Sequence, residues 1–353
     1  MKENTVAYLC SLHLYRMPYQ KHYTIPIFIP HLGCPHQCVF CNQRKISGAI
    51  REPEVCEVAD IIQRHLSTIP RENSHIEIGF FGGSFTGIDL DKQIEFLSLA
   101  HRQSTIGNLH GIRISTRPDC IDEHRLGILK DHGVTTIELG AQSMDDEVLR
   151  RSGRGHSVAD TEKASALILQ KGFRLGLQMM IGLPGDTLEK SLHTARRIVE
   201  LGADDTRIYP ALVIKDTTLA DLFSNGKYRP LPLGEAIRWS VEICRIFEMA
   251  GIKIIRLGLH PSEGLISGTE LLAGPYHPSF RELVETVIWK ERLENITVSE
   301  SGKHIVIHIA PDQYNVAIGY RAGNKRMLLD RFMSVKFIKD ESLTGRDFHV
   351  DHH

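Results

Sequence analysis

The sequence predicts an α/β fold built from parallel βα units, arranged either as an open sheet or as a sheet that curves toward a barrel. Short runs rich in β-branched residues alternate with longer amphipathic runs between Tyr23 and Leu257. Strands that alternate with helices in this way are typical of parallel βαβ units. Gly133 and Gly172 each follow an amphipathic run, where a left-handed C-terminal cap is favoured. Both observations place helices between consecutive strands.

The expected strands and helices follow one another along most of the chain. The strands are Ile25–Pro30, Ile76–Phe81, Ile112–Thr116, Thr136–Gly140, Leu175–Ile181, Arg207–Leu212 and Lys253–Leu257. The helices are Val55–Ile69, Leu90–His101, Ile121–His132, Val158–Lys171, Thr187–Leu201 and Gly234–Met249.

A smaller unit is expected after Arg256, where the sequence becomes rich in glycine, proline and histidine. Its expected elements are a helix at Phe280–Leu293, strands at Ile296–Val298, His304–Ile309 and Tyr314–Gly319, and a helix at Lys325–Phe332. We therefore divide the chain into an N-terminal extension (1–22), a βα barrel-like part (23–258) and a C-terminal α/β accessory region (259–353).

The composition is that of an ordinary globular chain. Hydrophobic residues make up 42% of the 353 residues and charged residues 24%, which is enough for a large core. The formal net charge of −1 gives no whole-chain attraction to nucleic acid or to a membrane. No apolar run approaches a bilayer span and residues 1–20 lack the features of a signal peptide, so we expect a cytoplasmic protein without a membrane partner. Seven unevenly spaced cysteines favour a reducing compartment.

Three of the cysteines lie close together directly after the first expected strand. Cys34, Cys38 and Cys41 have the spacing C-x3-C-x2-C, and thiolates select zinc, copper(I) or iron–sulfur clusters. Structural zinc usually takes four ligands, so a zinc site would need His31 or His36, and a chance grouping of core cysteines is the remaining alternative. A [4Fe–4S] cluster on three cysteines leaves one iron open to a substrate. We favour the cluster.

The cysteine motif resembles the signature of radical S-adenosylmethionine (SAM) enzymes, including the aromatic Phe40 directly before the third cysteine. This resemblance implies a partial parallel (β/α)6 barrel of TIM-like type, with the C-terminal α/β region as an appendage. It also implies that SAM is reductively cleaved to methionine and a 5′-deoxyadenosyl radical that abstracts hydrogen from a substrate. An electron donor of the flavodoxin or ferredoxin type is implied as a partner. In such enzymes the protein supplies binding and orientation for the cofactor.

Other segments that follow expected strands fit the same resemblance. Gly82 and Gly83 match the glycine-rich turn that binds the amino group of SAM, and Gly182 begins the turn that passes the adenine. Gln142 matches the residue that contacts the ribose of SAM, and Arg154 matches the residue that contacts its carboxylate. A guanidinium can bind both oxygens of a carboxylate. Without the resemblance, the glycines are ordinary tight turns and Arg154 is a solvated arginine. All these segments would lie at the carboxyl ends of strands, where βα barrels have their active sites.

Two stretches, Ile114–Asp119 and Ile208–Thr217, resemble the radical SAM domain of Elp3-type proteins more closely than that of coproporphyrinogen oxidases. Ser115 stands where Elp3 proteins have an acidic residue, and it is retained as a candidate cofactor contact. The segment His260–Glu282 resembles the accessory segment of uncharacterised bacterial proteins of this branch. No arginine- and glycine-rich loop of the kind that binds CoA follows Arg256, so acetyltransferase activity is not expected.

The substrate is open between an RNA nucleoside, for instance of tRNA, and a small molecule as in coproporphyrinogen-oxidase-like enzymes. The RNA interpretation depends on the Elp3-like stretches and on the basic residues Lys215, Arg229, Arg321, Lys325 and Arg326. The contrasting class is a non-enzymatic iron–sulfur carrier, in which Gln142, Arg154 and the glycine turns would have no role. The sequence assigns no catalytic residue, no oligomeric state and no fate of SAM.

Overall fold

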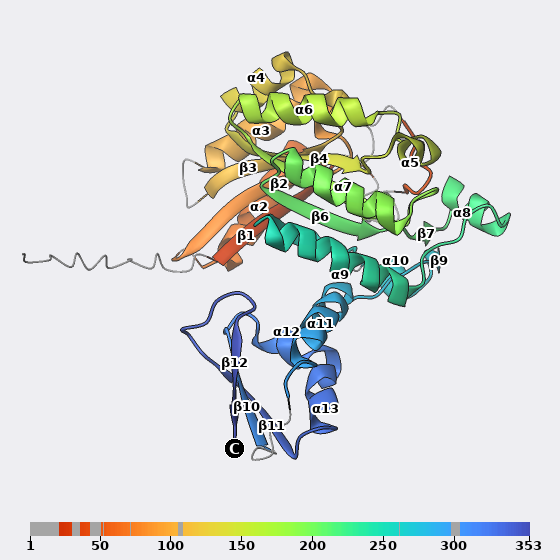
Figure 1. Ribbon diagram of the computed structural model, residues 1–353. Coiled ribbons are helices and arrows are strands. Elements are labelled where there is room, and N and C mark those ends of the chain that lie inside the picture. The colour runs from red at the N-terminus through yellow and green to blue at the C-terminus, as the bar shows by residue number, and fades with distance from the viewer. Residues whose placement is uncertain are drawn as a thin grey trace, which may run out of the picture.

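The main sheet is a curled half-barrel of parallel strands (Figure 1). The computed structural model describes residues 21–29, 36–42, 51, 53–70, 72–104, 109–260, 262–297 and 304–353. Seven strands pair in the order β1 (Lys21–Ile29), β2 (Ser74–Gly82), β3 (Leu109–Thr116), β4 (Val134–Gln142), β5 (Arg174–Ile181), β6 (Asp205–Pro210) and β8 (Lys253–Leu257). The expected α/β half-barrel is confirmed. Among the residues described, the sheet does not close, so β1 and β8 form its two edges.

Helices follow the strands, and the longer ones cover the outer face of this sheet (Figure 1). They are α2 (Val55–Thr68), α3 (Leu90–Ser104), α4 (Glu123–Asp131), α5 (Asp146–Arg151), α6 (Val158–Gln170), α7 (Leu188–Glu200), α8 (Thr218–Ser224) and α9 (Leu233–Met249). The six long helices were expected, whereas the short α5 and α8 were not. No helix in the described ranges is both long and apolar enough to cross a membrane.

Local sequence signals set the ends of these helices. Ser157 caps α6, because its hydroxyl accepts the Asp160 amide while the Asp160 carboxylate accepts the Ser157 amide. Thr187 caps α7 in the same position, accepting the Lys190 amide. At the C-terminal ends, Gly133 and Gly172 have positive φ values of 76° and 75°, as the sequence predicts for a left-handed cap.

The C-terminal region forms a small α/β unit around a three-stranded sheet, below the half-barrel in Figure 1. Three short elements precede it in the chain. Strand β7 (Val213–Ile214) pairs with β9 (Leu271–Ala273), and α10 (Glu263–Ile266) lies between them in the sequence. Its own elements are α11 (Phe280–Leu293), β10 (His304–Ile309), α12 (Tyr314–Ile318), α13 (Gly323–Leu329), β11 (Ser334–Lys339) and β12 (Phe348–His352).

Part of the expected C-terminal secondary structure is wrong. Residues Tyr314–Gly319, expected as a strand, form α12, because Ala317 is buried against the same core as the partly buried Tyr314 and Ile318. Ile296 and Thr297 lie in no strand, and Val298 lies outside the described residues. Strands β11 and β12 were not expected.

Helix α11 joins the two hydrophobic cores. Phe280, Val284 and Ile288 belong to the core of the half-barrel, whereas Trp289 and Leu293 belong to the core of the small sheet. The division at residue 258 stays a prediction.

Candidate functional site

A pocket lies at the carboxyl ends of strands β2, β3 and β4. Its lining includes, among the residues singled out from the sequence, Cys38, Phe40, Cys41, Gly82, Gly83, Ser115, Gln142 and Arg154. Segments far apart in the sequence are therefore brought together at one place. Cys34 lies outside the described residues.

The loop that carries Cys38 is fixed by backbone hydrogen bonds to two other segments. The Val39 amide donates to the Ser152 carbonyl at 3.0 Å, and the Val39 carbonyl accepts the Leu219 amide at 2.8 Å. Cys38 is 4% exposed, and Arg154 Nη1 donates to its Sγ at 3.2 Å. Cysteine sulfur is a soft metal ligand, and this contact fixes the Cys38 side chain in the pocket. The loop thus holds the Cys38 side chain in a defined position in the pocket.

The end of strand β4 places Gln142 and Arg154 side by side. Gln142 has a positive φ of 64°, an uncommon conformation that tends to occur at functional sites. Its side-chain carbonyl accepts from Gln178 Nε2 at 3.1 Å. Arg154 Nη2 donates to the Gly140 carbonyl at 2.7 Å, and Arg154 Nε is buried without a partner among the described residues. One donor of Arg154 is therefore left for a ligand.

Gly140 is required by the close approach of these two side chains. A Cβ atom there would lie 2.7 Å from Gln142 Nε2 and 3.2 Å from Arg154 Nη2. The sequence assigned no role to Gly140. A glycine as the last residue of the expected strand Thr136–Gly140, two positions before Gln142, was the signal that could have indicated this role.

The turn after strand β2 also needs glycine. Gly82 has φ of 109°, and a Cβ atom there would lie 2.4 Å from the Ile29 carbonyl oxygen. The Gly83 amide donates to the same oxygen at 2.8 Å. The turn therefore lies tight against the end of strand β1, with backbone polar groups beside the pocket.

Arg117 holds Arg154 in place and was not singled out as a site residue. Its side chain is buried, and it forms a bidentate pair with Asp119 at 2.8 and 2.9 Å. It also donates to the Arg154 carbonyl. Burial, above all, and the charges of Arg154 and Arg117 lower the pKa of the nearby His156 to about 3. His156 is therefore neutral at pH 7.

A network of buried charges continues from the pocket into the half-barrel. Arg113 pairs with Glu138 at 2.8 Å and with Asp205 at 3.0 Å, and Arg207 pairs with Glu138 at 2.7 Å. Burial would raise the pKa of Glu138, but Arg207 and Arg113 lower it. This network was not predicted from the sequence. A charged residue inside an otherwise apolar strand, such as Glu138 between Ile137 and Leu139, could have indicated the network, because a buried charge needs a partner.

A larger cleft of about 640 Å³ adjoins the pocket on the inner side of the sheet. The two share Gly82, Ser115, Glu138 and Gln178 in their linings. The edge strands β1 and β8 also line the cleft, so it lies along the gap that the half-barrel leaves. A molecule in this cleft would be next to the cysteine pocket.

Gly182 lies apart from these residues, in a second cleft that includes Asp186 and Tyr228. Its amide donates to the Asp186 carboxylate at 2.8 Å, and its carbonyl accepts the Tyr228 hydroxyl at 2.7 Å. The role of Gly182 as a cofactor contact stays a prediction, as do the roles of the pocket residues.

The fold and the pocket define the class of this protein: the chain belongs to the radical SAM superfamily. Residues 28–198 match the radical SAM superfamily, and residues 203–290 match the radical SAM C-terminal domain. An uncharacterized protein of Methanocaldococcus jannaschii is 30% identical over 60% of this chain and 68% of its own length.

Within the superfamily the chain resembles Elp3-like proteins. The tRNA uridine(34) acetyltransferase of Dehalococcoides mccartyi is 27% identical over 58% of this chain, which spans only 51% of that relative. The structure of Methanocaldococcus infernus Elp3 superposes with a TM-score of 0.61 at 21% identity, covering 77% of this chain and 64% of that one. At this identity the structural likeness shows the fold alone.

Proposed function

We propose that the protein is a radical SAM enzyme that binds a [4Fe–4S] cluster through Cys34, Cys38 and Cys41. In this proposal the enzyme reductively cleaves SAM and abstracts hydrogen from a nucleoside of RNA. The observation that carries the proposal is the convergence of Cys38 and Cys41 with Arg154 and Gln142 in one pocket beside an internal cleft.

The residues present fit this cofactor pair. Cys38 and Cys41 supply soft ligands, and three cysteines would leave one iron for SAM. Arg154, with one buried donor left, would bind the SAM carboxylate, and the backbone at Gly82 and Gly83 would bind its amino group. When bound, the cluster and SAM supply the radical chemistry, with the electron coming from a flavodoxin or ferredoxin. The chain itself supplies orientation and shields the pocket from water.

The similarity to tRNA uridine(34) acetyltransferases supports RNA as the substrate class. The cleft of about 640 Å³ lies in the size range of ordinary ligand sites, so one nucleoside turned out of its strand would fit. Acetyl transfer is not proposed.

The deciding experiment mixes anaerobically reconstituted protein with SAM and dithionite, and measures 5′-deoxyadenosine by chromatography. The wild type should form it, and Cys38→Ala should not. Unmodified tRNA should increase its yield if RNA is the substrate. No 5′-deoxyadenosine from a fully loaded cluster would favour an iron–sulfur carrier, and a yield that only small molecules increase would favour a small-molecule enzyme.

A further inference from the structure

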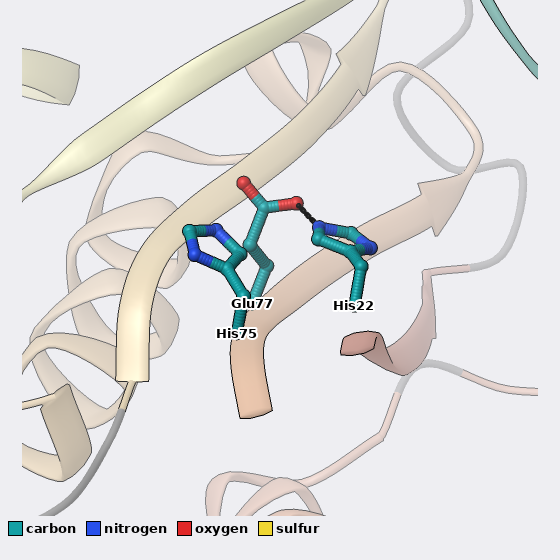
Figure 2. A group of neighbouring side chains, drawn as sticks. All are labelled: His22, His75 and Glu77. Atoms are coloured by element: carbon teal, nitrogen blue, oxygen red, sulfur yellow. Dashed lines mark hydrogen bonds and ion pairs between the residues drawn. The ribbon is translucent and has the colours of Figure 1, made fainter. Parts of the chain in front are cut away.

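Two histidines and a glutamate converge at the amino ends of strands β1 and β2, away from the cysteine pocket at the carboxyl ends. His22 lies directly opposite His75 in the β1–β2 pairing, and Glu77 follows two residues later on the same face. Their ligand-type atoms all lie within 4.8 Å of one another. Figure 2 shows the Glu77 carboxylate between the two imidazole rings, with the His22 Nε2 to Glu77 Oε2 contact of 2.8 Å dashed.

The buried carboxylates around Glu77 outnumber the buried guanidinium groups, which favours binding of a cation. Two guanidinium groups, Arg113 and Arg207, face three carboxylates of the buried network: Glu77, Glu138 and Asp205. Arg113 makes its short contacts to Glu138 and Asp205, and Arg207 makes its short contact to Glu138. Arg113 Nε reaches Glu77 at 3.4 Å. Glu77 is 2% exposed, and a buried carboxylate needs a positive partner.

His75 has a lone pair to offer. It stacks between His22 and His110, with ring centroids at 5.1 and 4.3 Å, and no hydrogen bond to its nitrogens occurs among the described residues. His110 Nδ1 is already occupied, because it accepts the Ile76 amide at 3.1 Å. His22, His75 and Glu77 are thus the three available ligands.

We propose that His22, His75 and Glu77 bind a zinc ion that holds strand β1 to strand β2. Two imidazoles and one carboxylate are a common zinc ligand set, and a water would complete the tetrahedron. Neighbouring ligand atoms on tetrahedral zinc lie about 3.4 Å apart. The His22 to Glu77 contact would therefore widen by roughly 0.6 Å as the ion replaces the shared proton. The ion can enter through the cleft, which His22 lines.

The experiment must separate this site from the cysteines, which also bind zinc. We would therefore use the full chain with Cys34→Ser, Cys38→Ser and Cys41→Ser, dialysed against zinc and analysed for bound metal. It should hold about one zinc per chain. This result does not depend on the proposed radical chemistry. Absence of zinc would therefore contradict the zinc site and leave the proposed radical SAM activity untouched.

Variants in the same background assign the ligands. His22→Gln and His75→Ala should each weaken zinc binding by at least about 10- to 100-fold, since even outer-shell changes have effects of that size. His110→Ala and His349→Ala are the controls, because His110 only stacks on His75 and His349 belongs to a second histidine–carboxylate group near the C-terminus.

Zinc should also raise the melting temperature of the chain with the three serine substitutions, and not that of its His22→Gln variant. Circular dichroism would verify that each variant is folded. Absence of zinc in the chain with the three serine substitutions would overturn the proposal, as would zinc binding that is lost in His349→Ala and kept in His22→Gln. The hydrogen bond between His22 and Glu77 alone would then explain why these side chains lie together.

Discussion

Cys38 has the most informative surroundings of any residue in the pocket, because a buried thiol lies within hydrogen-bond distance of a guanidinium. Arg154 and Cys38 lie 116 positions apart in the chain, so the fold brings the two side chains together. Cys244 lies in the hydrophobic core, where burial raises the pKa of its thiol. From these different surroundings we expect Cys38 to be a metal ligand and Cys244 to be a packing residue.

The first prediction follows from this contrast. Anaerobic wild-type protein should bind about four iron and four sulfide per chain, and Cys34→Ala, Cys38→Ala and Cys41→Ala should each abolish the cluster. Iron and sulfide analysis is the measurement. Cys56→Ala, Cys120→Ala and Cys244→Ala are the controls and should keep it. A wild type in which these cysteines hold zinc without sulfide would show that the interpretation as a cluster is wrong.

The second prediction separates binding of SAM from binding of the cluster. Arg154→Ala and Gln142→Ala should keep the iron but lower SAM affinity. The loss should be about 10- to 100-fold, or roughly 1.5–3 kcal/mol, for Arg154→Ala, because a charge-assisted contact is lost, and smaller for Gln142→Ala, which removes a neutral hydrogen bond. Equilibrium dialysis of SAM against the loaded protein measures this. Arg150→Ala is the control, since Arg150 is an exposed arginine on the same segment. Unchanged affinity in Arg154→Ala would assign the carboxylate to another residue.

The third prediction concerns His156, whose pKa of about 3 lies below the ordinary value of 6.5. Between these pH values the unfolded chain binds more protons than the folded chain, so stability falls as pH drops from 6.5 to 3. The slope is about 1.4 kcal/mol per pH unit at most. His156→Gln keeps a donor for the Ala141 carbonyl without the titration. Urea unfolding at pH 7 and pH 4.5 should show a smaller loss for the variant, and equal losses would contradict the assignment.

At the scale of the elements, the strand ends determine where the pocket forms. Gly82 ends β2 with φ of 109°, and Gln142 ends β4 with φ of 64°. Both conformations turn the chain sharply at the carboxyl edge of the sheet. The sequence predicts the strands because their apolar pattern is local. It does not predict the conformation of Gln142, since a positive φ at glutamine is imposed by tertiary contacts.

The fourth prediction tests the turn after β2. Gly82→Ala should lower the free energy of unfolding by roughly 1–3 kcal/mol, because the backbone conformation is unfavourable for alanine and its Cβ would clash with the Ile29 carbonyl. Gly127→Ala is the matched control. Gly127 lies in helix α4, where a Cβ atom would meet nothing within 4 Å, so alanine should stabilise the protein by about 0.5–1 kcal/mol. Urea unfolding measures both, and equal effects would contradict the role of Gly82.

At the scale of the whole molecule, the C-terminal unit lies beside the half-barrel. Tyr320 packs edge-on against His277 at 5.4 Å, and His277 lines a small pocket with Pro210 and Gly258, at the carboxyl ends of β6 and β8. The basic residues Arg321, Lys325 and Arg326 follow directly. A macromolecule bound to them would therefore lie near the carboxyl end of the barrel.

The fifth prediction tests RNA binding on this surface. Reversing the charge of Arg321, Lys325 and Arg326 to Glu should weaken tRNA binding and reduce its salt dependence, by about one unit of slope for each lost phosphate contact. Production of 5′-deoxyadenosine from SAM alone should not change. A salt titration of tRNA binding is the measurement, with Lys336→Glu on β11 as control. Identical weak binding by wild type and triple variant would remove the RNA interpretation.

The sequence by itself determined the alternation of strands and helices in the half-barrel and the cysteine motif, since these depend on residues close together in the chain. Tertiary structure alone decided which of the candidate residues meet. It placed Arg154 beside Cys38 but Gly182 in another cleft, and it paired β12 with β10 from a distant part of the sequence. It also assembled the network of Arg113, Glu138 and Asp205, which no local pattern encodes. Such contacts arise only when the curled sheet brings the inner faces of several strands together.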